Sequence, residues 1–144
     1  MMKFQKLRPG AITPTYGSPE AAGADLYACL DAPVTIAPGE TAKIPTGLAM
    51  ELPKGYAGLI FARSSLGVKR GLCPANKVGV VDSDYRGEFL IFLYNQSGTP
   101  QVVQPGERVA QLVIVPVLQE TFEEVDSLEE TQRGQGGFGS TGRF

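Results

Sequence analysis

The sequence predicts an all-β protein, built as a two-sheet sandwich or a barrel. Short apolar or alternating runs recur along the chain at regular spacing, and turn residues such as Pro38-Gly39 and Pro105-Gly106 separate them. The 11 prolines would be hard to place in helices, because proline breaks a helix interior. The expected strands span residues 4–7, 25–29, 34–37, 41–45, 48–52, 56–62, 77–81, 88–94 and 108–117.

Only two short helices are expected. One is a turn or two at residues 64–69, directly after an apolar strand. The other lies at residues 127–131, where Ser127 and Glu130 match a capping box. The acidic segment around it, residues 120–130, is expected to be solvated.

Composition limits the class of protein. At 144 residues and 42% hydrophobic content, the chain is long enough for one domain with its own core. It has no apolar run near the ~20 residues of a membrane span, and the basic N-terminus lacks an apolar leader. A net charge of −2 argues against a nucleic-acid surface. Cys29 and Cys73 lack metal spacing and favour isolated, buried thiols in a reduced compartment, so we expect a cytoplasmic protein.

The chain contains no histidine. A histidine general base and any nucleophile paired with histidine are therefore excluded. A zinc site built from two isolated cysteines and carboxylates would be improbable. Proton chemistry must come from a carboxylate, lysine, tyrosine, cysteine or a metal-bound water.

The C-terminal segment RGQGGFGSTGRF, residues 133–144, holds five of the 18 glycines. Glycine-dense backbone can present successive N–H groups to an anion. The segment matches GxGxxG and resembles a P-loop, but both motifs need a helix to follow, and the P-loop lysine position holds Ser140. A disordered linker is the alternative. Arg133 and Phe138 favour instead a flexible lid over a nucleotide.

Asp82-Ser83-Asp84-Tyr85-Arg86-Gly87 lies between two expected strands, and we expect it to form the tip of a hairpin. A calcium loop is excluded, because Arg86 and Leu93 stand where ligands are needed. A polar turn without function remains an alternative. Asp82 directly follows the apolar Val80-Val81, where a general base could be held rigidly.

Three further segments carry polar groups next to expected strands. Arg63 directly precedes the first short helix and Ser64 and Ser65 begin it, so that a guanidinium, hydroxyls and N–H groups suited to phosphate come together. Asp25 follows small residues that favour close packing. Gln111 is a single amide in an apolar strand. Packing or capping roles are the alternatives for all three.

In this order the five segments resemble the five motifs of the trimeric dUTP pyrophosphatases (dUTPases). They are AGADLYA at 22–28, ARSSLG at 62–67, the stretch from Asn76 through VGVVDSDYRG, GERVAQL at 106–112 and RGQGGFGSTG at 133–142. Ser65 stands where many members carry glycine. The resemblance implies a distorted β jelly roll at residues 1–126 with one short helix, and a glycine-rich arm at 127–144. It also implies a homotrimer in which the arm of one subunit closes a site formed by the other two.

The resemblance further implies hydrolysis of dUTP to dUMP and pyrophosphate. Asp82 would deprotonate the water that attacks the α-phosphorus, and Tyr85 would pack under the deoxyribose and exclude a 2′-hydroxyl. Mg²⁺ would be held by Asp25 through water. The remaining roles are implied for uracil (Asn76, Gly79, Val80, Val81 and, by stacking, Phe138) and for the phosphates (Arg63, Ser64, Ser65, Gln111, Arg133, Gly139, Ser140, Thr141).

Two other functions remain open from sequence. A dCTP deaminase has a similar fold, but its chemistry needs a glutamate at the cytosine ring, where this chain offers Asp82. A non-catalytic nucleotide-binding module is the second alternative, against which the intact Asp82 and the intact arm argue.

Overall fold

The computed structural model describes residues 1–142 and confirms the all-β fold class. One helix, α1 (Ser64–Arg70), interrupts the strands within these residues, at the place predicted. The strands are β1 (Lys3–Lys6), β2 (Thr15–Tyr16), β3 (Ala24–Tyr27), β4 (Val34–Ile36), β5 (Thr41–Pro45), β6 (Leu48–Glu51), β7 (Tyr56–Phe61), β8 (Leu72–Pro74), β9 (Gly79–Val81), β10 (Leu90–Asn95), β11 (Gln101–Val103) and β12 (Arg108–Pro116).

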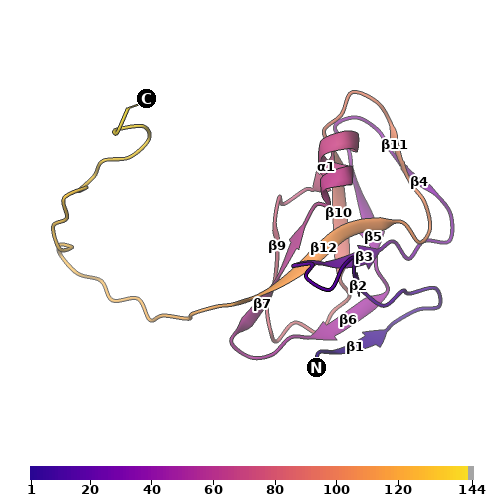
Figure 1. Ribbon diagram of the computed structural model, residues 1–144, viewed down its shortest axis with the longest axis horizontal. Coiled ribbons are helices and arrows are strands. Elements are labelled where there is room, and N and C mark those ends of the chain that lie inside the picture. The colour runs from indigo at the N-terminus through magenta and orange to yellow at the C-terminus, as the bar shows by residue number, and fades with distance from the viewer. Residues whose placement is uncertain (143–144) are drawn as a thin grey trace.

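The strands form one large sheet and three smaller ones, all antiparallel (Figure 1). The large sheet has the order β2-β3-β12-β7-β9, with the long strand β12 at its centre. A three-stranded sheet has the order β5-β10-β8, and the pairs β1-β6 and β11-β4 complete the body. In this arrangement β9 is an edge strand of the large sheet.

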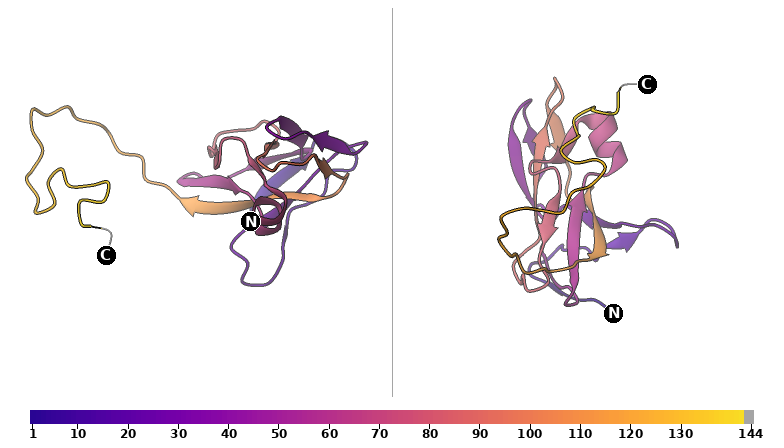
Figure 2. Two further views of the ribbon diagram at one scale, coloured as in Figure 1. Left: turned by 90° about the horizontal axis from the view of Figure 1, so that it is seen from above. Right: turned by 90° about the vertical axis from the view of Figure 1, so that its left-hand side faces the viewer.

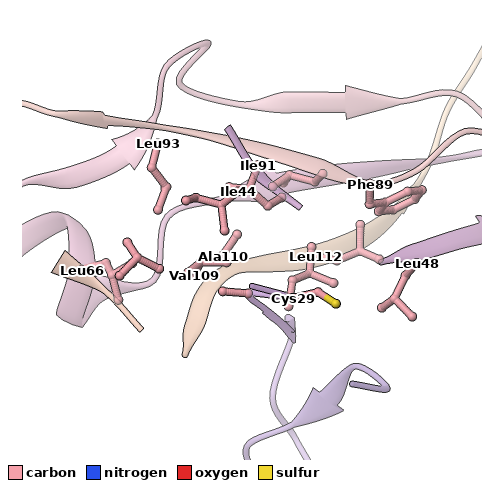
Figure 3. Close-up of a cluster of buried hydrophobic side chains, with 14 of the residues drawn as sticks. Cys29, Ile44, Leu48, Leu66, Phe89, Ile91, Leu93, Val109, Ala110 and Leu112 are labelled. Carbon is pink, nitrogen blue, oxygen red and sulfur yellow. The ribbon is translucent and has the colours of Figure 1, made fainter. Parts of the chain in front are cut away.

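One hydrophobic core fills the space between the sheets (Figure 3). Leu112 from β12 and Leu66 from α1 contribute to it, with Ile44 and Leu93 from the three-stranded sheet. Phe89, which directly precedes β10, is one of the largest buried side chains. The core therefore holds the strand that carries Gln111 and the end of β9, next to Asp82.

Three predictions about local structure are wrong. The loop at residues 82–87 does not join a hairpin, because β9 pairs with β7 whereas β10 pairs with β5 and β8. It is a connection between two sheets. No helix forms at residues 127–131. An isolated short helix is unstable without packing, and Leu128 there is 86% exposed. The short strands β2, β8 and β11 were not predicted.

The two cysteines are free, as expected. Cys29 is buried, but Cys73 is only partly buried, which corrects the expectation of two buried thiols. Within the described residues, none of the helices has the length and apolar character that crossing a membrane requires.

After β12 the chain leaves the body as an extended arm (Figures 1 and 2). Its last backbone hydrogen bond to the body is from the Val117 N–H to the Gly55 carbonyl, at 2.9 Å. Beyond it, the large apolar side chains of the arm are exposed to solvent, at Leu118, Phe122, Val125, Leu128 and Phe138. Residues 133–142 of the glycine-rich segment thus lie away from the strands of their own chain (Figures 1 and 2).

Candidate active site

The end of β9 and the loop after it border a hollow of about 300 Å³. Its floor comes from buried or half-buried residues of the core, among them Ile60 and Phe89. The hollow brings together residues that the sequence analysis assigned to the base, the sugar and the chemistry: Asn76, Gly79, Val80, Val81, Asp82 and Tyr85.

Asp82 stands where a strand emerges from the core, as predicted. Val81 before it is buried, whereas Asp82 is exposed. Asp82 also lines a second, larger hollow of about 1010 Å³, beside the start of β7 and the start of the arm. The carboxylate therefore lies on the border between the two hollows, where it can contact both a bound ligand and solvent.

Tyr85 is held by its neighbours in the loop. Its hydroxyl donates to the Glu88 carbonyl at 2.9 Å, and its ring lies 6.3 Å from the ring of Phe89. The ring folds back over Gly87 so closely that a Cβ at that position would come within 2.6 Å of the Tyr85 Cζ. Gly87 is therefore required by close packing of the aromatic ring.

A second group of polar residues lies across the centre of the large sheet. Asp25 is 7% exposed, and each of its carboxylate oxygens is bound by an arginine. Arg63 donates through Nε to Oδ1 at 2.7 Å, and Arg108 donates through Nη1 to Oδ2 at 3.2 Å. The pairing of Arg63 with Asp25 and the presence of Arg108 were both missed from sequence. The only sequence signal for Arg108 was its charge at the start of the expected strand 108–117, within the GERVAQL motif.

Gln111 belongs to the same group. It stands directly opposite Asp25 on β3 and opposite Phe61 on β7, so the three side chains share one face of the sheet. Its amide donates to the Ala62 carbonyl at 2.9 Å, and a Cβ at Gly23 would come within 2.5 Å of its Oε1. The Gln111 side chain is thus fixed against the backbone that leads to Arg63.

Ser64 and Ser65 open helix α1 and are exposed. The hydroxyl of Ser65 accepts from Nη1 of Arg63 at 3.4 Å. The far end of the helix is anchored by Arg70, which binds the Glu107 carboxylate, the Gln101 amide oxygen and the Val102 carbonyl. These contacts fix the helix that presents both serines.

The arm completes neither group. Arg133 donates through Nε to the Gly136 carbonyl at 2.9 Å, and Phe138 is fully exposed with a φ of 50°. Gly139, Ser140 and Thr141 are exposed too, and none of these residues lines either hollow. Two clusters of side chains can be named here: the Asp82 group around the smaller hollow (Asn76, Gly79, Val80, Val81, Asp82, Tyr85) and the Asp25 group on the large sheet (Asp25, Arg63, Ser64, Ser65, Arg108, Gln111). Across residues 1–142, no hydrogen bond or ion pair joins one group to the other. Within residues 1–142, no polar contact therefore links these three sets of predicted residues to one another.

Residues 1–142 contain no cluster of three or more carboxylates and cysteines that could hold a metal ion directly. A site for Mg²⁺ does not need one, because Mg²⁺ usually keeps several waters and takes one or two carboxylates plus substrate phosphates. Asp25 fits such a role in part. Each carboxylate oxygen has two acceptor positions, and one arginine occupies one of them on each oxygen, so that one position on each remains for a water.

Comparison with known proteins agrees with this geometry. The family model described as dUTPase matches residues 10–142. A deoxyuridine 5'-triphosphate nucleotidohydrolase of Burkholderia cenocepacia (strain HI2424) is 55% identical over 143 residues, 99% of this chain and 97% of that protein. The protein of the same name from Burkholderia thailandensis is 56% identical with the same coverage.

Solved structures give the same result. The dUTPase of Staphylococcus bacteriophage 80alpha, a G164S mutant with dUpNHpp, superposes with a TM-score of 0.86 at 27% identity over 99% of both chains. The D95N mutant dUTPase from phage phi11 of S. aureus, whose structure reveals the coordination of a structural Mg(II) ion, gives 0.79 at 25% identity over 90% of this chain and 99% of that one. The chain belongs to the dUTPase family and is a dUTP nucleotidohydrolase, a hydrolase acting on a phosphoanhydride.

Proposed function

We propose that this enzyme hydrolyses dUTP to dUMP and pyrophosphate by attack of water on the α-phosphorus, with Asp82 as the general base. The observation that carries the proposal is the position of Asp82 at the border of the hollow that also holds Asn76 and Tyr85. In a chain without histidine, a carboxylate that is held at a strand end and open to solvent can take the proton of the water. The reaction would keep uracil out of DNA and supply dUMP for thymidylate synthesis.

Recognition of uracil is assigned to Asn76 and the backbone of β9. Because β9 is an edge strand that pairs only with β7 among the described strands, the other side of its backbone remains available for hydrogen bonds. The uracil ring presents alternating acceptors and a donor, as a peptide strand does, and could pair with this edge. Gly79 packs tightly, because an added Cβ would lie 3.2 Å from Ile60 Cβ. Close fitting of this backbone edge to uracil would leave no room for a 5-methyl group.

Phosphate binding is assigned to the Asp25 group and the arm. Arg63, Ser64, Ser65 and Gln111 come from the end of β7, the start of α1 and β12. Arg133, Gly139, Ser140 and Thr141 would come from the arm at residues 127–144, and Phe138 would stack on uracil. Charge neutralisation and positioning are what phosphoanhydride hydrolysis chiefly requires.

We infer a homotrimer with shared active sites. The position of the arm supports this inference, because its predicted site residues are exposed and line neither hollow in a single chain. The extended, partly apolar arm supports it as well, since such a segment gains stability by packing on a neighbouring subunit. The body at residues 1–126 and the arm would then serve two different sites.

Mg²⁺ is the proposed cofactor, held by Asp25 through water. When bound, the ion would neutralise the triphosphate and orient it. Arg63 and Arg108 hold the Asp25 carboxylate in a fixed orientation, in which its remaining acceptor positions could bind the waters of the ion. A cytoplasmic location, in keeping with two free cysteines, remains a prediction.

The test measures pyrophosphate and ammonia release from dUTP, UTP, dTTP and dCTP with Mg²⁺. Pyrophosphate is expected chiefly from dUTP, with a much lower kcat/KM for the other nucleotides and no ammonia. Ammonia from dCTP would establish a deaminase instead. Sedimentation and activity of a chain truncated before Arg133 test the assembly and the arm. We expect a trimer with little hydrolysis, and full activity of the truncated chain would contradict the role of the arm.

A further inference from the structure

Glu88 directly follows the loop that carries Asp82 and Tyr85, and its side chain is only 17% exposed. One carboxylate oxygen accepts from the backbone N–H of Gly47 at 2.8 Å. The other accepts from Nη2 of Arg8 at 2.7 Å. The carboxylate of Glu88 therefore ties the end of the loop to two distant segments of the chain.

The backbone of Glu88 holds the Tyr85 ring. Its carbonyl oxygen accepts the hydrogen bond from the Tyr85 hydroxyl at 2.9 Å, the bond that fixes the outer end of the ring. The next residue, Phe89, is buried, and its N–H donates to the Leu48 carbonyl at 2.8 Å. A shift of the Glu88 backbone would thus move the acceptor on which the position of the ring depends.

The rest of the loop is held chiefly by bonds within itself. The Tyr85 N–H donates to the Asp82 carbonyl at 3.2 Å, and Arg86 donates to the carbonyls of Ser83 and Tyr85. Such local bonds shape a turn but do not locate it on the body. Among residues 82–88, the Glu88 side chain makes the long-range polar contacts, at separations of 41 and 80 residues.

The Arg8 side of this contact is also anchored. The Leu7 N–H donates to the Gly47 carbonyl at 2.7 Å, so that Gly47 is bound from one side by the segment before Arg8 and from the other by Glu88. Arg8 has 45% of its side chain exposed, whereas the Gly47 backbone is buried. The bond to Gly47 is therefore the less solvated of the two contacts and the stronger restraint.

We propose that Glu88, supported by Arg8, is a positioning residue that determines selectivity for the sugar. It fixes the loop backbone so that the Tyr85 ring forms a rigid wall of the hollow, and a ribose 2′-hydroxyl cannot be accommodated by displacement of that ring. The inference rests on the proposed packing of Tyr85 under the deoxyribose. Glu88 itself acts through Tyr85 and takes no part in the chemistry.

The test compares kcat and KM for dUTP and UTP in Glu88→Ala, Glu88→Gln and Arg8→Met. In Glu88→Ala we expect the kcat/KM of UTP relative to dUTP to rise by about tenfold, the size of a single lost discriminating contact, chiefly through KM. Glu88→Gln keeps an acceptor for Gly47 but loses the charge facing Arg8, so it should fall between wild type and Glu88→Ala. Arg8→Met should resemble Glu88→Gln.

Two controls separate this role from general destabilisation. Glu40→Ala removes an exposed glutamate of the Pro38-Gly39 turn and should leave the ratio unchanged. Tyr85→Phe removes the hydroxyl donor, and its effect should not add to that of Glu88→Ala, because both break the same restraint. An unchanged ratio in Glu88→Ala, or a parallel loss of activity on both substrates, would overturn the proposal. If Glu88→Ala does not fold, Arg8→Met and Glu88→Gln decide it by the same criterion.

Failure of the proposed function gives a different result. In that case the wild-type enzyme would release no pyrophosphate from dUTP, or substitution of Tyr85 itself would leave the UTP to dUTP ratio unchanged. If substitution of Tyr85 changes the UTP to dUTP ratio of kcat/KM, but substitution of Glu88 or Arg8 does not, only the positioning role of Glu88 is contradicted.

Discussion

Arg63 and Asp25 form a 2.7 Å ion pair, although 38 residues separate them in the chain. Arg63 occupies the N-cap position of α1, and Asp25 lies in β3 on the far side of β12 from β7. The pair thus joins the helix that presents Ser64 and Ser65 to the centre of the large sheet. The segments of Arg63 and Asp25, which have separate proposed roles in phosphate and magnesium binding, are therefore joined by an ion pair.

Replacement of Asp25 by Asn should destabilise the fold, because it leaves two guanidinium groups without their carboxylate. The Asp25 side chain is 9% exposed, so we expect the free energy of unfolding to fall by about 1–3 kcal/mol. Chemical denaturation measures this change. The matched control is Glu51→Gln, which breaks the exposed pair with Lys3 and should cost less than about 1 kcal/mol. Equal effects of the two substitutions would contradict a structural role for the Asp25 pair.

Replacement of Asp82 by Asn should keep nucleotide binding and lower kcat by about 10²–10⁴-fold, because the amide cannot take the proton of the attacking water. Single-turnover hydrolysis and dUTP binding, measured on the same preparation, separate the two effects. Asp84→Asn is the control, since Asp84 lies in the same loop and lines only the larger hollow. It should keep most of the activity. Near-normal turnover in Asp82→Asn would exclude this residue as the base.

Replacement of Gly87 by Ala should displace the Tyr85 ring, because the new methyl group would occupy the space of the ring. The backbone at Gly87 has an ordinary φ, so the effect comes from this clash and not from strain. We expect a raised KM for dUTP and a smaller change in kcat. Gly98→Ala is the control, since an added Cβ there meets open space. If both variants had the same KM as wild type, the close packing of Tyr85 on Gly87 would not matter for binding.

The local features of the fold could be predicted from sequence, but the pairing of strands could not. The run before Asp82 is apolar enough to predict both a strand and an exposed carboxylate at its end, and both predictions are confirmed. A loop between two strands has the same local pattern whether it closes a hairpin or connects two sheets. The prediction of a hairpin at residues 82–87 was wrong for this reason.

The candidate site shows the same limit. Gly87 and Tyr85 lie two residues apart, and the motif that contains them could be recognised in the sequence. The bonds of Arg63 with Asp25 and of Glu88 with Arg8 bridge 38 and 80 residues, and no periodicity or spacing encodes them. Arg108 was missed because a charge at the start of a strand is ordinary on a solvated edge. Only the alignment of β12 beside β3 brings it to Asp25.

Replacement of Phe138 by Ala should weaken closure of the arm over the base, because it removes the ring proposed to stack on uracil. Stacking of a base on an aromatic ring contributes about 1–3 kcal/mol, so we expect KM for dUTP to rise by at least several-fold. Phe122→Ala is a matched control from the same extended C-terminal segment, before the arm at 127–144. Both rings are fully exposed in the single chain, but Phe122 lies outside the glycine-rich segment. A larger loss of dUTP binding in Phe122→Ala than in Phe138→Ala would assign the arm to subunit contact and not to the base.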